Sequence, residues 1–138
     1  MRTAEPVFVD TGAWIALALT RDPLHARARE TWHQLTGAAA RLHTSVPVVL
    51  ETFTFLDRNT SRNVALAWKD SLATVPRLKV LPASAADVER AWPYFDRPDL
   101  HKLSAVDAVS FVLMTERRIR TAFAFDSHFA TAGFRMVG

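Results

Sequence analysis

The sequence contains no cysteine, only four glycines and very few lysines. Without cysteine, disulfide scaffolds, thiolate zinc sites, iron–sulfur clusters and cysteine nucleophiles are excluded, and a reducing cytoplasm is the compartment that fits. Of the 17 Lys and Arg residues, set against 14 Asp and Glu for a net charge of +3, the lysines are only Lys69, Lys79 and Lys102. Arginine presents a planar fork that suits phosphate and carboxylate, so this composition permits an anionic partner.

Long apolar segments are also missing. The most apolar runs extend for about a dozen residues or fewer, whereas a membrane span takes about 20. The segment from Met1 to Pro6 lacks the apolar stretch of a signal peptide. We therefore expect a soluble, cytoplasmic protein with no membrane contact, folded as a single domain over residues 1–138.

Short apolar strands alternate with helical segments along the whole chain. Pro6–Val9 is continuously apolar, as in a strand buried on both faces. Further strands are predicted at residues 41–43, 78–81, 121–125 and 134–137. Helices are predicted at residues 13–19, 61–74, 84–95 and 104–118. Another helix is predicted to begin at Asp22-Pro23 and to run to residue 35, and one capped by Thr44 or Ser45 to run to residue 58. Strands separated by helices pair in parallel, which predicts an α/β fold.

Two aspartates follow predicted strands. Asp10 follows the first strand and Asp126 follows a late one. In open parallel sheets ligands bind at the carboxyl ends of the strands, so both residues stand where chemistry is expected. The alternative for each is structural, because an Asp at the end of a strand is often a helix cap or a turn former.

Two further acids lie on predicted helices. Glu51 has Pro47, Val48, Thr54 and Phe55 as its neighbours at helical spacing, and no cation lies one turn away. Burying such a carboxylate is costly unless a cation pairs with it, and the alternative is a solvated helix edge. Asp107 has its own alternative, because Ser104-x-x-Asp107 also fits a capping box, as Ser84-x-x-Asp87 does.

The four acids together predict a metal site. Asp10, Glu51, Asp107 and Asp126 are far apart in the sequence, and each lies beside apolar, core-forming residues. If they converge, their repulsion must be offset by cations. Oxygen ligands favour Mg²⁺ or Mn²⁺, which activate water and stabilise a leaving oxygen in phosphodiester hydrolysis.

The chain as a whole resembles the PIN-domain ribonucleases, and within them the VapC-like toxins of prokaryotic toxin–antitoxin pairs. The likeness rests on the order and spacing of short segments: Val7-Phe8-Val9-Asp10-Thr11-Gly12, Thr44-Ser45 before Glu51, Leu103-Ser104-Ala105-Val106-Asp107-Ala108, and Phe125-Asp126-Ser127-His128-Phe129.

The resemblance implies a PIN-like three-layer α/β/α sandwich with a short central parallel sheet. It also implies a metal-dependent endoribonuclease that hydrolyses RNA phosphodiester bonds as the toxin of a pair. Its four acids would be catalytic and would hold Mg²⁺, with Mn²⁺ as a substitute. The implied partners are RNA, a small cognate antitoxin whose C-terminal segment occupies the toxin groove, and a second copy in a homodimer.

Three residues are auxiliary candidates: Thr11, Ser104 and His128. Thr11 follows the first acid, where the family often has a hydroxyl or an amide that orients water or metal. Two positions depart from the family pattern. Ala124 replaces a frequent Thr or Ser, and His128 replaces a frequent acid, so the resemblance leaves a second metal ion undefined.

Other functions fit less well. A phosphoaspartyl hydrolase needs a second Asp where this chain has Gly12, and a receiver domain needs a late Lys at a strand end, which the segment around Asp126 does not supply. The remaining alternative is a catalytically inert PIN-like module that binds RNA or protein. Retention of four costly acids argues against it.

The other aromatic and basic residues favour structural roles. The tryptophans, Trp14, Trp32, Trp68 and Trp92, are expected in the core or a dimer interface rather than as base-stacking platforms. The basic segments around Arg27 and Arg117 are either solvated or contact phosphate. If the four acids are sequestered in a pocket, 17 basic residues face ten acidic ones elsewhere, a net +7 that suits a phosphodiester substrate.

Overall fold

The computed structural model describes residues 4–138 and is built on a five-stranded parallel sheet. The strands are β1 (Pro6–Val9), β2 (Arg41–Ser45), β3 (Leu78–Leu81), β4 (Thr121–Phe123) and β5 (Arg135–Val137). Their order in the sheet is β3-β2-β1-β4-β5. The chain moves outward from β1 to β3 and then returns to the other side of β1. The carboxyl ends of β1 and β4 therefore flank the point where the winding direction reverses, which is where ligands bind in such sheets.

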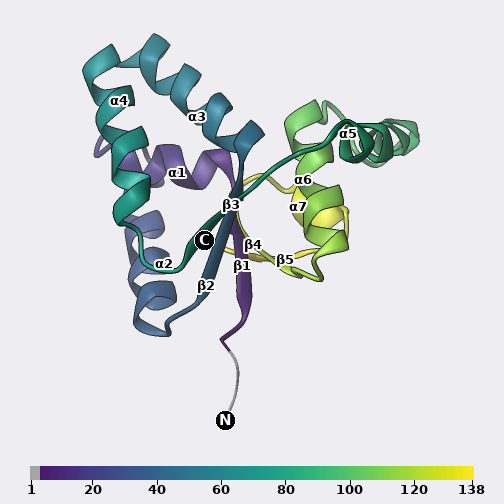
Figure 1. Ribbon diagram of the computed structural model, residues 1–138, viewed down its shortest axis with the longest axis horizontal. Coiled ribbons are helices and arrows are strands. Elements are labelled where there is room, and N and C mark those ends of the chain that lie inside the picture. The colour runs from purple at the N-terminus through teal and green to yellow at the C-terminus, as the bar shows by residue number, and fades with distance from the viewer. Residues whose placement is uncertain (1–3) are drawn as a thin grey trace.

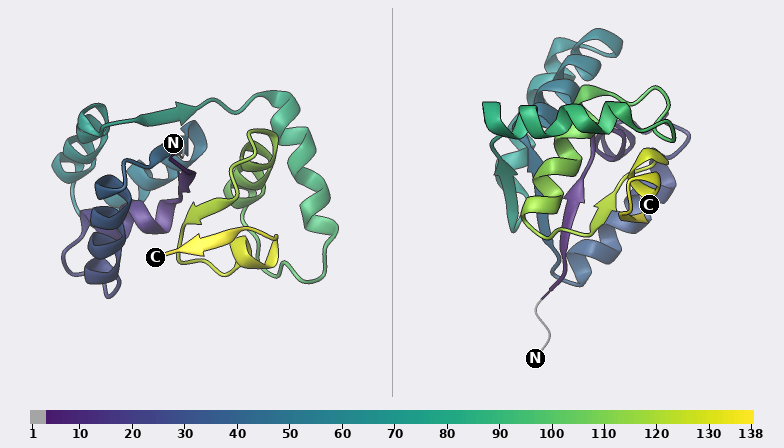
Figure 2. Two further views of the ribbon diagram at one scale, coloured as in Figure 1. Left: turned by 90° about the horizontal axis from the view of Figure 1, so that it is seen from below. Right: turned by 90° about the vertical axis from the view of Figure 1, so that its right-hand side faces the viewer.

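Helices cover both faces of the sheet. They are α1 (Thr11–Ala18), α2 (His25–Gly37), α3 (Val46–Asn59), α4 (Arg62–Ser71), α5 (Ala85–Ala91), α6 (Ala105–Glu116) and α7 (His128–Thr131), with 3₁₀ turns η1 (Leu72–Thr74) and η2 (Trp92–Asp96). Figure 1 shows α1, α2 and α4 on one side and α5, α6 and α7 on the other, and the left view of Figure 2 shows the same separation. The predicted three-layer α/β/α sandwich is confirmed.

Helix α3 joins the two layers at the carboxyl end of the sheet. It begins directly after β2 and contacts α1 and α4 on one side and α6 on the other. Ser45 both ends the strand and caps the helix, because its Oγ accepts a hydrogen bond of 3.2 Å from the Val48 amide. This abrupt change from strand to helix places the first turns of α3 beside the ends of the strands.

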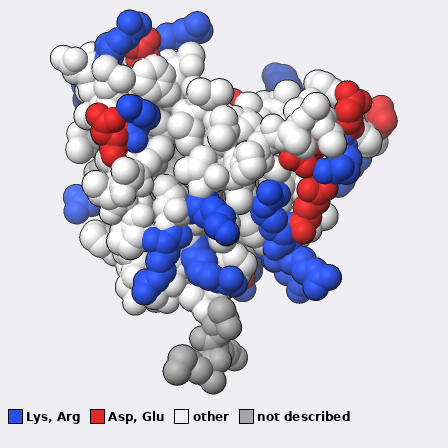
Figure 3. Space-filling view, viewed as in Figure 1, with Lys and Arg blue, Asp and Glu red and all other residues white. Residues whose placement is uncertain are grey.

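Charged side chains are unevenly distributed over the surface. Figure 3 shows Lys and Arg gathered over the lower part of the molecule, where Figure 1 shows β1 and β2 beginning. On the same face, Asp and Glu lie mainly toward the outer helices. None of the helices within residues 4–138 has the length and apolarity needed to span a bilayer.

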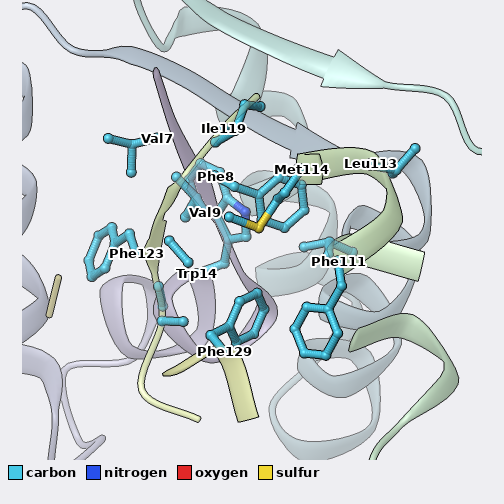
Figure 4. Packing of buried hydrophobic residues seen from close by; sticks show 14 of the residues in the cluster. Val7, Phe8, Val9, Trp14, Phe111, Leu113, Met114, Ile119, Phe123 and Phe129 are labelled. Carbon is cyan, nitrogen blue, oxygen red and sulfur yellow. The ribbon is translucent and has the colours of Figure 1, made fainter. Parts of the chain in front are cut away.

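The core is apolar and centred on β1. Figure 4 shows Phe8 and Val9 of this strand close to side chains of α6 and to Phe129. Phe8, Val9, Phe111 and Phe129 are fully buried, and the rings of Phe111 and Phe129 meet edge to face with centroids 5.0 Å apart. On the other face Trp14 contacts two further tryptophans of the helical layer. Because β1 is covered on both sides, it reads in the sequence as one continuous apolar run.

Several predicted boundaries are wrong. The second helix begins at His25 rather than at Asp22-Pro23, because the Asp22 carboxylate accepts a 2.8 Å hydrogen bond from the Leu24 amide and closes a turn instead. The helices predicted at 61–74 and 84–95 each end in a 3₁₀ turn, at Leu72 and Trp92. In the second case Pro93 follows at once and cannot continue the α-helical hydrogen bonds.

Two further corrections concern strands. Strand β2 extends to Ser45, so Thr44 lies inside the strand and is not a helix cap. Strand β4 ends at Phe123 rather than Phe125; the Ala124 amide still donates to the Val137 carbonyl, and beyond it the chain turns toward α7. The single domain over residues 1–138 stays a prediction. Residues 1–3 lie outside the described residues, and so does that part of the Met1–Pro6 segment in which no signal peptide was expected.

Candidate metal centre

Asp10 is the most deeply buried of the four predicted acids. It follows β1, donates its amide to the Phe123 carbonyl of β4 at 3.0 Å, and starts α1 through its own carbonyl. Asp10 is 4% exposed, and its Oδ1 atom has no hydrogen-bond partner within residues 4–138. Burial, together with the charges of Glu51 and Asp126, raises its pKa to about 7 despite hydrogen bonds from neighbouring amides. The carboxylate therefore lacks a compensating cation.

Asp107 enters the same region from α6. Its amide donates to Ser104 Oγ at 3.0 Å, which caps the helix, while within residues 4–138 its carboxylate accepts no return bond from the Ser104 amide. Burial is the largest cause that raises the pKa of Asp107 to about 8, followed by the charges of Asp10 and Asp126 and a shared hydrogen bond with Asp126. The capping-box alternative thus accounts for Ser104 but leaves the Asp107 carboxylate without its usual local partner.

Asp126 lies three residues beyond β4, in the loop before α7, and not at the strand end where it was expected. Its Oδ1 accepts a 2.9 Å hydrogen bond from the His128 amide and lies 2.8 Å from His128 Nδ1. Burial opposes its ionisation, but these contacts with His128 outweigh it and lower the pKa of Asp126. The contacts with His128 therefore favour the ionised form of Asp126.

His128 forms part of the cluster. Its Nε2 donates to the His101 carbonyl, and its Nδ1 lies 3.9 Å from Asp107 Oδ2. Nδ1 makes no well-directed hydrogen bond within the described chain, so its contact with Asp126 is mainly electrostatic. Although burial works against the ring's charge, the His101 carbonyl and Asp126 raise the pKa of His128. Side-chain atoms of Asp107, Asp126 and His128 all lie within 4.8 Å of one another.

Glu51 approaches from α3, the helix that joins the two layers. It is half-buried and close enough for its charge to act on both Asp10 and Asp107. It also lines an apolar groove of about 610 Å³ with Leu50, Phe55 and Val106. The four acids therefore converge from four separate segments, with Glu51 at the edge of the group.

The donor set fits a divalent cation. The charges of Asp10, Asp107 and Asp126 act on one another; Asp10 and Asp107 are buried with strongly raised pKa values, Asp10 has an oxygen without a partner within residues 4–138, and the Asp126 side chain is partly exposed. A cluster of this kind repels itself unless a cation compensates it, and carboxylate oxygens are the ligands preferred by Mg²⁺ and Mn²⁺. His128 Nδ1 adds one nitrogen at the edge of the group.

Two of the auxiliary candidates lie around these acids. Thr11 is buried, and its hydroxyl has no hydrogen-bond partner within the described residues. Ser104 is exposed and acts as the cap of α6. Its hydroxyl is thus engaged by the helix that carries Asp107.

Two residues that support the cluster were missed. Thr44 is fully buried and donates to the Val9 carbonyl at 2.9 Å while accepting from Trp14 Nε1 at 3.1 Å, so it joins β1, β2 and α1 directly before Asp10. The sequence pointed to Thr44 as a possible helix cap and as part of the Thr44-Ser45 segment of the PIN resemblance, but not to this bridging role. His101 holds His128 through a backbone carbonyl, and no side-chain pattern in the sequence can reveal such a contact.

The remaining histidines and tryptophans lie outside the cluster. His25 Nδ1 contacts the Ala16 carbonyl at 2.7 Å and His43 Nδ1 contacts the Arg41 carbonyl at 3.0 Å, which are structural contacts. Trp14 lies between Trp32 and Trp68, with ring centroids 5.7 and 6.0 Å away, as expected for core residues.

The sequence profile of the PIN domain matches residues 7–135. The chain belongs to the PIN domain family. This match includes all four acids and every strand except the first residue of β1 and the last two of β5. The resemblance stated from short sequence segments is confirmed.

A known protein of similar sequence is an endonuclease. The chain is 36% identical over 129 residues to the 23S rRNA-specific endonuclease VapC20 of Mycobacterium tuberculosis, a match that covers 93% of this chain and 95% of the relative. The crystal structure of VapC20, described as a Sarcin-Ricin loop cleaving toxin, superposes with a TM-score of 0.80 at 33% identity, covering 93% of this chain and 95% of that one. The prediction of a PIN-domain nuclease of the VapC-like toxin group is confirmed.

The fold extends to more distant proteins. A VapBC2 structure from Rickettsia felis, bound to a promoter DNA fragment, matches with a TM-score of 0.70 over 95% of this chain and 96% of that one. At 10% identity this likeness concerns the fold alone.

Proposed function

We propose that this protein is a metal-dependent endoribonuclease that cleaves the sarcin–ricin loop of 23S ribosomal RNA as the toxin of a toxin–antitoxin pair. The observation that carries the proposal is the meeting of Asp10, Asp107 and Asp126 at the winding reversal of the sheet. The choice of RNA follows the similarity to VapC20 over nearly the whole chain. With ribosomal RNA as its substrate, the protein would act in the cytoplasm.

Asp10, Asp107 and Asp126 would hold a Mg²⁺ or Mn²⁺ ion, with Glu51 beside them. Such an ion supplies an activated water and charge stabilisation for the leaving oxygen of a phosphodiester. The raised pKa values of Asp10 and Asp107 support this assignment, because they mark carboxylates that the protein itself does not compensate.

Other side chains would orient the reacting groups. The buried Thr11 hydroxyl offers a hydrogen bond to water or to a phosphate oxygen beside Asp10. His128 keeps Asp126 ionised and fixes its direction through two contacts. Ser104 fixes the first turn of α6, and with it the position of Asp107.

The cognate antitoxin would occupy the groove beside Glu51. Leu50 is 61% exposed there, and Phe55 and Val106 complete an apolar lining next to the acids. For the proposed homodimer, the exposed aromatic pair Trp92 and Phe95 on η2, with ring centroids 6.1 Å apart, is a candidate contact.

Replacing the buried acid tests the function directly. We expect Asp10→Asn to lower Mg²⁺- or Mn²⁺-dependent cleavage of an RNA hairpin carrying the sarcin–ricin loop by at least about 100-fold, because even outer-shell partners of a metal typically contribute 10–100-fold. The fold should persist, since Asn has the same shape and removes an uncompensated charge. Cleavage is measured on gels with and without EDTA. Equal activity of wild type and variant would overturn the assignment, and an inactive wild type that still binds the hairpin would favour the inert module.

A further inference from the structure

Arginines stand at the beginning of four of the five strands. Arg41 is the first residue of β2 and Arg135 the first of β5, while Arg77 and Arg120 directly precede β3 and β4. In the parallel register, Arg41 lies opposite Pro6 and Arg135 opposite Thr121. These residues therefore share the amino edge of the sheet, at the opposite end from the acidic cluster. We refer to Arg41, Arg77, Arg118, Arg120 and Arg135 as the basic edge.

Three residues of the basic edge line a cavity. Arg118, Arg120 and Arg135 line a pocket of about 620 Å³ together with Glu5 and Thr121. Glu5 is already engaged, because one carboxylate oxygen pairs with Arg135 and the other accepts a 2.6 Å hydrogen bond from the Thr121 hydroxyl. Within residues 4–138, Arg118 and Arg120 form no ion pair, so their charges are left for an external anion.

Two arginines of the basic edge lie in tight turns that lead into strands. Arg77 and Arg118 adopt left-handed conformations, with φ of 61° and 56°, in the turns that lead into β3 and β4. Glycine normally occupies such positions after a helix because it lacks a Cβ atom. The turn before β5 follows that rule with Gly133, whose φ is 103°. The turn before β2 has Ala39 in the same conformation, with φ of 55°, whereas the turns before β3 and β4 carry an exposed arginine whose charge contributes to the basic edge.

We propose that the basic edge binds the phosphate backbone of a folded RNA, as a second contact remote from the acidic cluster. This inference rests on the proposed function, since the RNA is its substrate. Neighbouring strands lie about 4.8 Å apart, so the arginines form a row about 20 Å long across the sheet. A row of forked cations suits repeated phosphates.

The distance between the two contacts defines which RNA can reach both. Glu5 and Asp10 are separated by the length of β1, about 16 Å at 3.3 Å per residue. A small hairpin held at the acidic cluster leaves the basic edge uncovered, whereas a large folded RNA can extend around the sheet. The basic edge would therefore contribute to binding of ribosomal RNA and not to cleavage of a minimal substrate.

The test compares two RNAs and two charge-matched variants. The RNAs are a minimal sarcin–ricin hairpin and a long ribosomal RNA fragment that contains it. The variant is Arg118→Gln/Arg120→Gln, and the control is Arg21→Gln/Arg29→Gln. The control also removes two exposed positive charges, one before α2 and one within it, and neither arginine forms an ion pair within residues 4–138. Binding is measured as a function of salt in an Asp10→Asn background, and cleavage in the otherwise native protein.

For the long RNA, we expect the Arg118→Gln/Arg120→Gln variant to raise Kd about 5- to 20-fold and to lower the slope of log K against log salt by about 1–2, as for the loss of two phosphate contacts. Hairpin binding, hairpin cleavage and the control variant should stay within about twofold of the parent. Arg41→Gln/Arg77→Gln, at the other half of the basic edge, should weaken binding of the long RNA in the same way.

Unchanged affinity of both variants for the long RNA would overturn the proposal. If binding of an acidic antitoxin peptide were lost at the same time, the basic edge would be assigned to a protein partner. Failure of the wild type to cleave either RNA, with the predicted loss of affinity intact, would reject the proposed function and support the basic edge.

Discussion

Two helices of this protein begin with the same motif and have opposite electrostatics. In α5, Ser84 and Asp87 form a reciprocal capping box: the Asp87 amide donates to Ser84 Oγ at 3.1 Å, and the Ser84 amide donates back to Asp87 Oδ2 at 2.8 Å. In α6, the first bond is present between Asp107 and Ser104 at 3.0 Å, but across the described residues no return bond to the Asp107 carboxylate is formed.

The difference comes from what surrounds each carboxylate. Hydrogen bonds from Ser84, and an ion pair of 2.6 Å with Arg90, lower the pKa of Asp87. Asp107 is instead buried beside Asp10 and Asp126, and its pKa rises to about 8. Two identical local signals therefore serve different purposes, one to stabilise a helix and the other to position a charge at the end of the sheet. The position of the helix start relative to the sheet determines which of these two roles the aspartate has.

The largest contrast is expected in cleavage. Asp107→Asn should lower metal-dependent cleavage of the sarcin–ricin hairpin at least about 100-fold, since it removes a charge from the proposed metal-binding group. Asp87→Asn should remain within about twofold, because it changes a helix cap outside the acidic cluster. The measurement is the initial cleavage rate at saturating Mg²⁺. Similar losses in both variants would indicate that Asp107 acts through folding alone.

The second contrast is in the pH dependence of stability without metal. Asp10 and Asp107 have folded pKa values of about 7 and about 8, raised from ordinary values of 3.8, so the folded protein retains protons that the unfolded chain releases. Their contribution to stability is present at low pH and is lost as pH rises between about 4 and 8. The raised pKa of His128 also makes stability fall as pH rises. The lowered pKa values of Asp126 and Asp87 have the opposite sign, because their contribution to stability is lost only as pH falls below about 4.

We therefore expect the melting temperature in EDTA to fall by at least about 5 °C from pH 5 to pH 8, and Mg²⁺ to restore it. Asp107→Asn should flatten the profile and Asp87→Asn should leave its slope unchanged. A wild-type profile that is level over this range would contradict the raised pKa values.

The third contrast concerns stability at one pH. At pH 8 without metal, Asp107→Asn should raise the melting temperature by at least about 4 °C, because it removes repulsion among buried carboxylates. Asp87→Asn should lower it by about 2–4 °C, because it weakens a cap and removes one of the two acidic partners of Arg90, the other being Glu116. Differential scanning calorimetry separates the two signs. A clear loss of stability in Asp107→Asn would return that residue to the capping role.

The same pair of motifs shows how far the sequence alone reaches. The continuous apolar run before Asp10 predicted a buried parallel strand, and Ser45, Ser61, Ser84 and Ser104 marked the first turns of four helices correctly. These signals are local: hydrophobic runs, caps and spacing act over a few residues. The convergence of the four acids was expected from the apolar setting of each, although the position of Asp126 was misjudged because strand β4 ends where its pairing with β5 ends.

What the sequence did not reveal depends on distant contacts. Thr44 looked like a helix cap, but its hydroxyl donates to the Val9 carbonyl and accepts from Trp14 Nε1, and both residues are remote in the chain. The basic segment around Arg117, which contains Arg118 and Arg120, stood out in the sequence as a possible phosphate contact, but only the parallel register places it at the same edge of the sheet as Arg41 and Arg135. The same holds for Ser104-x-x-Asp107: the motif predicted the helix start, while the direction of the carboxylate depended on the fold.

The smallest contrast tests whether the two serines differ. Ser84→Ala and Ser104→Ala each remove a hydroxyl that accepts one amide hydrogen bond, and both should lower the melting temperature by about 2–4 °C, the usual effect of losing an N-cap. Only Ser104→Ala should also lower hairpin cleavage, by about 2- to 10-fold, because loosening the first turn of α6 displaces Asp107 and misplacements of about 1 Å are costly in catalysis. Ser104→Thr, which keeps the cap, should restore both properties. If Ser84→Ala lowered cleavage to the same degree, the effect would come from general destabilisation, and Ser104 would have no positioning role.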